Sequence, residues 1–355
     1  MPPHARRRLR LAALVAAPLA LVLGLSLATT QGATGSGVAP IAGRGDPAGQ
    51  RVEAVAARAL VSQVSTVGEQ PAGTDPSPVP APAGASHYVI QAGGLPRKYS
   101  LHLPVGRGAP AAGRPLLIVL DGKANVYPHA ENTYGVTELG QSRNAAVVYG
   151  VTYQASGTWD AGNCCNPAAA QHIDDVAYVR GVIADVETRT TVDPRHVYLL
   201  GFSLGGMLAY RVACQTDRLV AGIAVMSGSV QVSGCHPSHS VRVLAVHGLR
   251  DTIVPFLGQT RPAKLPAPSR SVAASLAPFL SEDGCTRSGH AYPSTVAAAR
   301  AFAQIVTVRY RCARGSVTLV VDSVLGHRWP RGVAGYDPEL DATRLIAEAF
   351  LPRRG

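Results

Sequence analysis

A serine flanked by glycines lies in the segment Gly201–Gly206, which reads Gly-Phe-Ser-Leu-Gly-Gly. The apolar run His196–Leu200 precedes this segment, and the small-residue pattern of a helix continues through Met207–Tyr210. A strand, a tight turn and a helix in this order present a nucleophilic serine, and the turn leaves no room for side chains two residues to either side. Chance supplies such a motif about 0.3 times in a chain of this composition. Ser203 is therefore a candidate nucleophile only if the chain also supplies a base and an acid.

Two later residues satisfy that requirement. A serine hydroxyl becomes nucleophilic when an imidazole accepts its proton and a carboxylate orients the imidazole, and behind such a turn the acid precedes the histidine in the chain. Asp251 follows an apolar run that ends at His247, and His327 lies in the loop after the last apolar run. We predict Asp251 as the acid and His327 as the base. The alternatives are a turn-capping role for Asp251 and a solvated loop position for His327, and His247 is expected to pack or to hydrogen-bond.

Further residues are predicted around the reacting centre. An oxyanion hole needs two backbone N–H groups, and we assign these to Leu204 and to either Lys123 or Ala124 in the loop after the run 116–120. A carboxylate at Asp121 beside this loop is unfavourable unless it is turned away or paired, with Lys123 as a candidate partner. Two tryptophans are expected to line the substrate cleft, with simple packing as the alternative: Trp159 and Trp329.

Short apolar runs alternate with helical patterns along the chain from residue 85. The predicted strands are 87–91, 100–103, 116–120, 145–151, 196–200, 221–226, 241–247, 305–310 and 317–322. The predicted helices are 172–190, 204–214, 272–281 and 339–350. Continuously apolar strands that alternate with helices indicate an α/β protein with a mostly parallel, doubly wound sheet and helices on both faces.

The N-terminal part has a different composition. Residues 1–28 begin with arginines and continue as an apolar run to Ala28, which is typical of a secretory signal peptide; an uncleaved membrane anchor is the alternative. Residues 29–84 are rich in Ala, Gly, Pro and Ser and are predicted to be a disordered linker. Residues 85–355 are the predicted catalytic domain, expected to be secreted and monomeric, with membrane contact only through an uncleaved N-terminus.

Charge and cysteines limit the function classes. The net charge is +11, and residues 1–84 hold seven arginines against four acidic residues, so +8 remains on the predicted domain. No basic run is interleaved with aromatic residues, so nucleic acid is not an expected partner. Metal binding is not expected either, because no C-x-x-C motif occurs.

Six cysteines behind an export signal predict disulfides. Cys285 and Cys312 flank a predicted helix end and strand start and are the favoured pair. The adjacent residues Cys164 and Cys165 are not expected to bridge each other. A disulfide from each of Cys214 and Cys235 to one of these two residues is the pairing considered.

Taken together, several separated motifs resemble the secreted polyhydroxybutyrate depolymerase and feruloyl esterase group of α/β-hydrolases. The resemblance extends from about His87 to Phe350 and rests on the segments 159–165, 174–176, 192–195, 201–207, 247–251 with 254–255, 271–285 and 326–330. It implies the α/β-hydrolase fold, a Ser203–Asp251–His327 triad and hydrolysis of carboxylic esters without a cofactor. Two positions depart from the family pattern: Asp121 replaces the usual histidine before Gly122, and Arg331 replaces the usual glycine after the Trp-Pro pair.

The sequence thus predicts a secreted serine esterase that acts on a small-molecule or polymeric ester, of the polyhydroxyalkanoate type or the feruloyl and acetyl type. The alternative is an exported, catalytically silent protein of the same fold that binds an ester or a glycan, with Asp121 having spoiled the oxyanion hole.

Overall fold

The computed structural model describes residues 84–125, 127–153, 157–259, 268–286, 305–332 and 339–351. The predicted signal peptide 1–28 and all but the last residue of the predicted linker 29–84 lie outside the described residues. Within the described ranges, no helix combines the length and the apolar character needed to cross a membrane.

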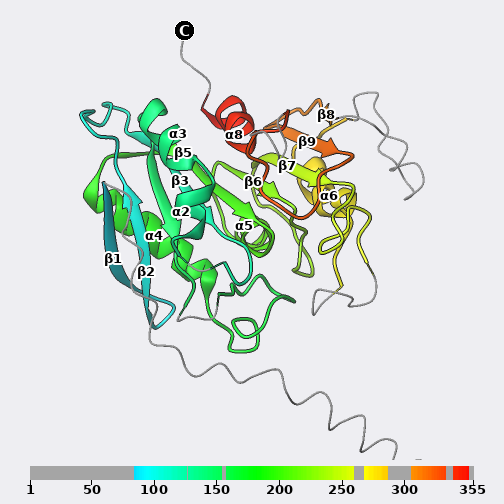
Figure 1. Ribbon diagram of the computed structural model, residues 1–355, viewed down its shortest axis with the longest axis horizontal. Helices are drawn as coiled ribbons and strands as arrows, with labels where there is room; N and C mark the ends of the chain where they lie inside the picture. Colours follow the sequence, from blue (N-terminus) through cyan, green and yellow to red (C-terminus); the bar gives the residue numbers. More distant parts are fainter. Residues whose placement is uncertain are drawn as a thin grey trace, which may run out of the picture. The chain divides into compact units, whose positions relative to one another are not determined.

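Across the described residues, one nine-stranded sheet forms the centre of the fold (Figure 1). Its strand order is β1-β2-β4-β3-β5-β6-β7-β9-β8, with β1 and β2 at the left of the figure and β8 and β9 at the right. The strands are β1 (Ala85–Ala92), β2 (Leu95–His102), β3 (Arg114–Leu120), β4 (Ala146–Gly150), β5 (Val192–Phe202), β6 (Gly222–Met226), β7 (Arg242–Gly248), β8 (Ile305–Arg309) and β9 (Val317–Asp322).

Six neighbouring strands of the sheet pair in parallel, in the order β4, β3, β5, β6, β7 and β9. The strands at its two edges pair antiparallel: β1 with β2, β2 with β4, and β8 with β9. All nine strands were predicted, although β5 begins four residues earlier than expected. Asp193 and Pro194 belong to this added part of β5, where the pairing with β3 shifts register between Arg114 and Leu116.

Alternating side chains of the strands divide the core into two layers, because successive residues of a strand point to opposite faces. On one face, Leu199 and Ile223 pack with helices α4 (Asp175–Arg189), α5 (Leu204–Gln215) and α6 (Val272–Glu282). On the other face, Leu200 and Ala224 pack with α2 (His129–Thr133), α3 (Val136–Arg143) and α8 (Ala342–Phe350). Each fully buried aliphatic side chain contributes about 1.5–3 kcal/mol to folding. The predicted sheet with helices on both faces is confirmed.

Helices α2 and α3 were missed by the sequence analysis. Each is short, and α3 buries only Val136, Leu139 and Gly140, so the apolar pattern spans about one turn. Left-handed residues bound α3, with Gly135 at its start and Asn144 at its end. A pattern of this length does not distinguish a helix from a loop.

Three disulfides occur in the structure, and one of them was predicted. Cys285 is joined to Cys312, as expected. The other expected pairings were wrong: Cys164 is joined to its neighbour Cys165, and Cys214 is joined to Cys235. The chain brings the last turn of α5, which carries Cys214, against the loop after β6, which carries Cys235. Their Cα atoms lie 4.9 Å apart, within the usual range for a disulfide. Cys164 and Cys165 are both buried, and their Cα atoms lie 3.0 Å apart.

We expect peptide mapping of the unreduced protein to recover two crosslinked peptide pairs, 214 with 235 and 285 with 312. The peptide that contains Cys164 and Cys165 should be lighter than its reduced form by two hydrogens and linked to no other peptide. Replacing Cys214 and Cys235 together by alanine should cost about 3 kcal/mol of unfolding free energy, the value for a loop of this length. A crosslink from residue 164 or 165 to residue 214 or 235 would contradict this pairing.

Candidate active site

Ser203 lies at the sharp turn between β5 and α5. Its backbone has φ 51° and ψ −116°, a conformation that side-chain-bearing residues rarely adopt. The amide of Ser203 donates a hydrogen bond to the carbonyl of Met226 at the end of β6, at 2.8 Å. The strained turn thus raises the serine above the carboxyl ends of the parallel strands, where the residues that follow other strands can reach it.

Two glycines make this turn possible. A Cβ atom built at Gly201 would overlap the backbone of Gly205 and Gly206, and one built at Gly205 would overlap the carbonyl of Leu120 at the end of β3. Neither glycine has a positive φ, so the requirement comes from close backbone packing and not from backbone conformation. Helix α5 therefore begins in direct contact with strand β3.

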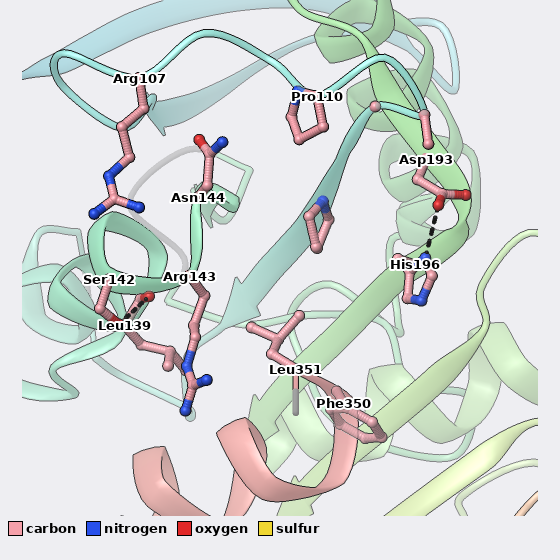
Figure 2. Close-up of a pocket in the computed structure, with 13 residues that line it drawn as sticks. Arg107, Pro110, Leu139, Ser142, Arg143, Asn144, Asp193, His196, Phe350 and Leu351 are labelled. Carbon is pink, nitrogen blue, oxygen red and sulfur yellow. Dashed lines mark hydrogen bonds and ion pairs between the residues drawn. The ribbon is translucent and has the colours of Figure 1, made fainter. Parts of the chain in front are cut away.

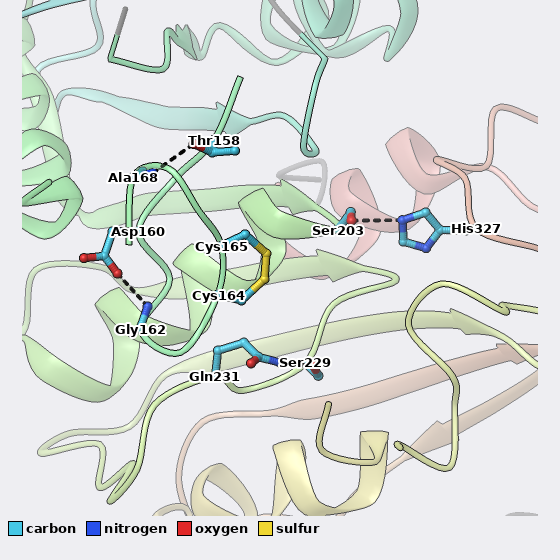
Figure 3. The surroundings of a disulfide bond; sticks show 10 residues. All are labelled: Thr158, Asp160, Gly162, Cys164, Cys165, Ala168, Ser203, Ser229, Gln231 and His327. Carbon is cyan, nitrogen blue, oxygen red and sulfur yellow. Dashed lines mark hydrogen bonds between the residues drawn. A yellow bond between two sulfur atoms is a disulfide. The ribbon is translucent and has the colours of Figure 1, made fainter. Parts of the chain in front are cut away.

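A chain of two hydrogen bonds joins the three predicted residues. The Nε2 atom of His327 lies 2.9 Å from the Oγ of Ser203, and its Nδ1 lies 2.8 Å from the Oδ2 of Asp251. Figure 3 shows the side chains of Ser203 and His327 turned toward each other. Asp251 follows β7 and His327 follows β9, two neighbouring strands of the sheet. The structure therefore brings together residues that are far apart in the sequence.

The carboxylate of Asp251 is fully buried yet well partnered. Its second oxygen accepts hydrogen bonds from the amides of Ile253 and Val254, at 2.9 and 2.8 Å. Burial alone would raise the pKa of Asp251, but the hydrogen bond and charge of His327, with further help from His247 and the Val254 amide, lower it below its ordinary value. Asp251 therefore remains a carboxylate, and its Oδ2 can accept a hydrogen bond from the imidazole.

His247 has a supporting position. Its Nε2 lies 2.7 Å from the carbonyl of Val254 and 3.6 Å from the Oδ2 of Asp251. Burial lowers the pKa of His247, although Asp251 and the Val254 carbonyl act in the opposite direction. A neutral ring whose Nε2–H donates to Val254 fixes the loop that carries Asp251. This is the hydrogen-bonding role that the sequence predicted.

The loop after β3 offers one of the two predicted oxyanion donors. The amide of Ala124 donates to the carbonyl of Gly157 at 2.8 Å, so Ala124 is not the donor. Lys123 remains as a candidate in this loop. Leu204 is the other predicted donor, and its amide belongs to the first turn of α5, at the positive end of the helix dipole. Of the two predicted residues, Lys123 therefore stays the candidate donor.

The carboxylate of Asp121 has four hydrogen-bonding partners. Its carboxylate accepts from the amide of Gly122 at 2.7 Å, from Asn125 Nδ2 at 3.1 Å and from the hydroxyl of Tyr134. Its other oxygen pairs with Nδ1 of His129 at 2.7 Å. The predicted pairing of Asp121 with Lys123 is therefore replaced by a pairing with His129, because α2 brings this histidine over the end of β3.

The two tryptophans differ in position. Trp159 is 1% exposed, donates its indole N–H to the carbonyl of Asp121 and stacks on Tyr178, so its expected place in the cleft was wrong. Trp329 stacks on Tyr134 with ring centroids 4.2 Å apart and lines the cleft beside Ser203. A buried hydrogen bond and ring stacking account for Trp159 as a packing residue.

The cleft beside Ser203 has a volume of about 660 Å³, within the range of small-molecule sites. Its described lining residues are Lys123, Asn125, His129, Thr133, Tyr134, Phe202, Ser203, His327, Arg328, Trp329 and Arg331. Sequence analysis did not assign His129, Asn125 or Phe202 to this site. The positions of His129 and Asn125 depend on α2 and on the loop before it, which no periodic pattern marks. Phe202 is the last residue of β5, directly before Ser203.

A second cavity of about 620 Å³ lies elsewhere (Figure 2). It is lined by residues at the start of β3 and near the start of β5, including Gly113 and Asp193, whereas Ser203 follows the end of β5. Figure 2 shows Asp193 paired with His196 there, and no serine is placed against that histidine. Among the described residues, no group of three or more His, Cys, Asp or Glu side chains is placed to hold a metal ion.

Comparisons with known proteins agree with this geometry. Residues 166–266 match the family described as Phospholipase/Carboxylesterase. A Nocardia uniformis subsp. tsuyamanensis protein named as an esterase, NocK, is 29% identical over 325 residues, which cover 81% of this chain and 92% of that protein. Feruloyl esterase B of Piromyces equi is 30% identical over 105 residues, 28% of this chain but only 19% of that enzyme.

A solved structure supports the fold. The acetyl xylan esterase from Aspergillus awamori superposes with a TM-score of 0.51 at 13% identity, covering 75% of this chain and 98% of that one. The chain therefore has the α/β-hydrolase fold. The two sequence relatives described above are named as esterases, in agreement with the resemblance to the feruloyl esterase group.

We expect Gly205→Ala to destabilise the protein by at least about 1–3 kcal/mol, because the added methyl group must displace the Leu120 carbonyl. Gly108→Ala is the matched control, since a Cβ at Gly108 meets nothing within 4 Å. Urea unfolding of both variants measures the difference. Equal stability of the two variants would contradict the close packing of α5 on β3.

Proposed function

We propose that the chain is a secreted serine esterase in which Ser203 forms an acyl-enzyme. His327 Nε2 accepts the proton of Ser203 as the hydroxyl attacks the ester carbonyl, and Asp251 stabilises the resulting imidazolium through Nδ1–H. The amides of Leu204 and Lys123 hold the negative oxygen of the tetrahedral intermediate. The alcohol leaves with the proton from His327, and water then releases the acid by the same steps in reverse order.

The observation that carries the proposal is the continuous hydrogen-bond chain from Ser203 through His327 to Asp251. The same serine occupies a strained turn, a kind of conformation that clusters at active sites. The hydrogen bond from His327 also lowers the pKa of Asp251, so that a carboxylate faces the imidazole. The turn and the hydrogen-bond chain support one role for Ser203.

Secretion is supported by the signal-like N-terminus and by three disulfides, which persist in oxidising compartments. The substrate is an ester of the feruloyl and acetyl type or of the polyhydroxyalkanoate type. The names of the relatives favour the first of these.

The alternative of a silent binding protein rested on Asp121 spoiling the oxyanion hole. The carboxylate of Asp121 is instead engaged by Gly122, Asn125, His129 and Tyr134. Four donors disperse its charge, so it opposes an oxyanion less than a free carboxylate would. The same measurements that test the esterase distinguish it from a binding protein.

We expect wild-type protein to hydrolyse a short p-nitrophenyl ester and to react covalently with a fluorophosphonate probe at Ser203. Ser203→Ala should lose both the activity, by about 10³-fold or more, and the label. Ser86→Ala, at an exposed position of β1, is the matched control and should keep both. Full turnover by Ser203→Ala would refute the proposal.

Asp251→Asn should lower kcat by about 10³–10⁴-fold with an intact fold. The asparagine oxygen can still accept from the amides of Ile253 and Val254, but its NH₂ group then faces His327 Nδ1. This arrangement favours the tautomer that carries a proton on Nε2, which cannot accept from Ser203. Steady-state kinetics and the rate of fluorophosphonate labelling measure the loss. A variant with unchanged thermal stability and wild-type kcat would assign Asp251 a purely structural role.

A further inference from the structure

The cleft beside Ser203 carries an unusual concentration of positive charge. Besides His327, four of its described lining residues have basic side chains: Lys123, His129, Arg328 and Arg331. None of the described residues that line it is acidic. An ester carbonyl is neutral, so hydrolysis of an uncharged ester needs no such lining beyond the oxyanion donors.

The nearby carboxylates do not cancel this charge at the cleft surface. Asp251 is buried behind His327 and is used by that ring and by two amides. Asp341, which pairs with Arg331 through the backbone, directs its carboxylate to the amides of Thr343 and Arg344 at the start of α8. Asp121 is the third carboxylate, and its side chain is turned to His129, Asn125 and Tyr134 and is not among the described lining residues.

Asp121 lies beneath the cleft and orients His129 toward it. The Asp121 side chain is 9% exposed, whereas that of His129 is 41% exposed and lines the cleft. The hydrogen bond from Nδ1 to the carboxylate raises the pKa of His129, against the opposite effect of burial. Tyr134 and Asn125 fix the same carboxylate. A buried acid with three side-chain partners holds the His129 ring at the cleft surface, and general arginine richness does not explain this arrangement.

The rest of the lining describes what else the cleft accepts. Phe202, Tyr134 and Trp329 supply an aromatic wall, with the Tyr134 and Trp329 rings stacked on each other. Aromatic surface and basic side chains together suit a molecule with an apolar body and a negative group. Arginine binds carboxylates and other planar anions with two hydrogen bonds, and lysine adds a point charge.

We infer that the substrate is an ester with a negatively charged group, such as a carboxylate, in its acyl or alcohol part, and that Lys123, His129 and Arg331 recognise that group. The inference rests on the proposed esterase function, whose reaction it leaves unchanged. It names the substrate class: anionic esters are hydrolysed in preference to neutral esters of the same shape.

Two matched substrate pairs test the inference and locate the charge. In the first, 4-acetoxybenzoate is compared with 4-acetoxybenzamide, so that the alcohol part differs in charge. In the second, the mono-4-nitrophenyl ester of adipic acid is compared with the same ester of adipic acid monoamide, so that the acyl part differs. Each kcat/KM is divided by the rate of hydroxide hydrolysis of that ester, which removes intrinsic reactivity.

We expect wild-type protein to prefer the anionic member of at least one pair by about tenfold. The preference should fall severalfold in Lys123→Gln and in Arg331→Gln, and close to one in the double variant. It should also shrink between about 0.02 M and about 0.5 M ionic strength, because salt screens partly exposed charges. Lys98→Gln and Arg344→Gln, at exposed positions outside the lining residues, are matched controls and should keep the wild-type preference.

A preference near one in both pairs, or a preference that survives the double variant, overturns the inference while the esterase function stands. If all four esters are left intact and Ser203 also fails to react with a fluorophosphonate, the proposed function itself fails, and the inference fails with it. The comparison of anionic with neutral esters thus tests the inference, and the fluorophosphonate label tests the proposed esterase function, so failure of one can be told from failure of the other.

Discussion

The site depends on how closely the first turn of α5 packs against the ends of β3 and β5. Only glycine at positions 201 and 205 allows this approach, since any Cβ there would overlap the neighbouring backbone. The approach forces Ser203 into a left-handed conformation and aims its hydroxyl over the edge of the sheet. It also brings the amide of Leu204 beside the loop that follows β3. The proposed nucleophile and the proposed donor at Leu204 are therefore positioned by one packing contact.

The order of the strands in the sheet brings Asp251 and His327 to Ser203. β7 and β9 are neighbours in the sheet, so the loops after them, which hold Asp251 and His327, meet at the same edge as Ser203. The Asp251 carboxylate is expensive to bury, and it is retained because two amides and one imidazole satisfy it. His247 secures the turn from the other side. The hydrogen bonds that keep Asp251 charged thus also hold the loop after β7 in place.

Sequence analysis located every strand and the long helices because their apolar patterns are local. Ser203, Asp251 and His327 were found for a second reason: the chemistry fixes their order and their positions after strands. What was missed depends on contacts between distant segments. The pairing of Cys214 with Cys235 follows from where α5 ends, and the packing of Trp159 follows from its bond to the Asp121 carbonyl. Helix α2 is five residues long, so His129 and its pairing with Asp121 left no signal in the sequence.

Both departures from the family pattern occur at the same cleft. Asp121 stands where the resembling family has histidine, and Arg331 stands where it has glycine. Considered alone, an acid beside the oxyanion loop weakens catalysis. In the structure, however, its carboxylate is turned to His129, Tyr134 and Asn125, and it orients the His129 ring toward the cleft. Arg331 adds a cation to the same lining. Both substitutions therefore shape the surface that would meet a negatively charged ester: Arg331 supplies charge, Asp121 places the His129 ring, and neither alters the groups that would perform the hydrolysis.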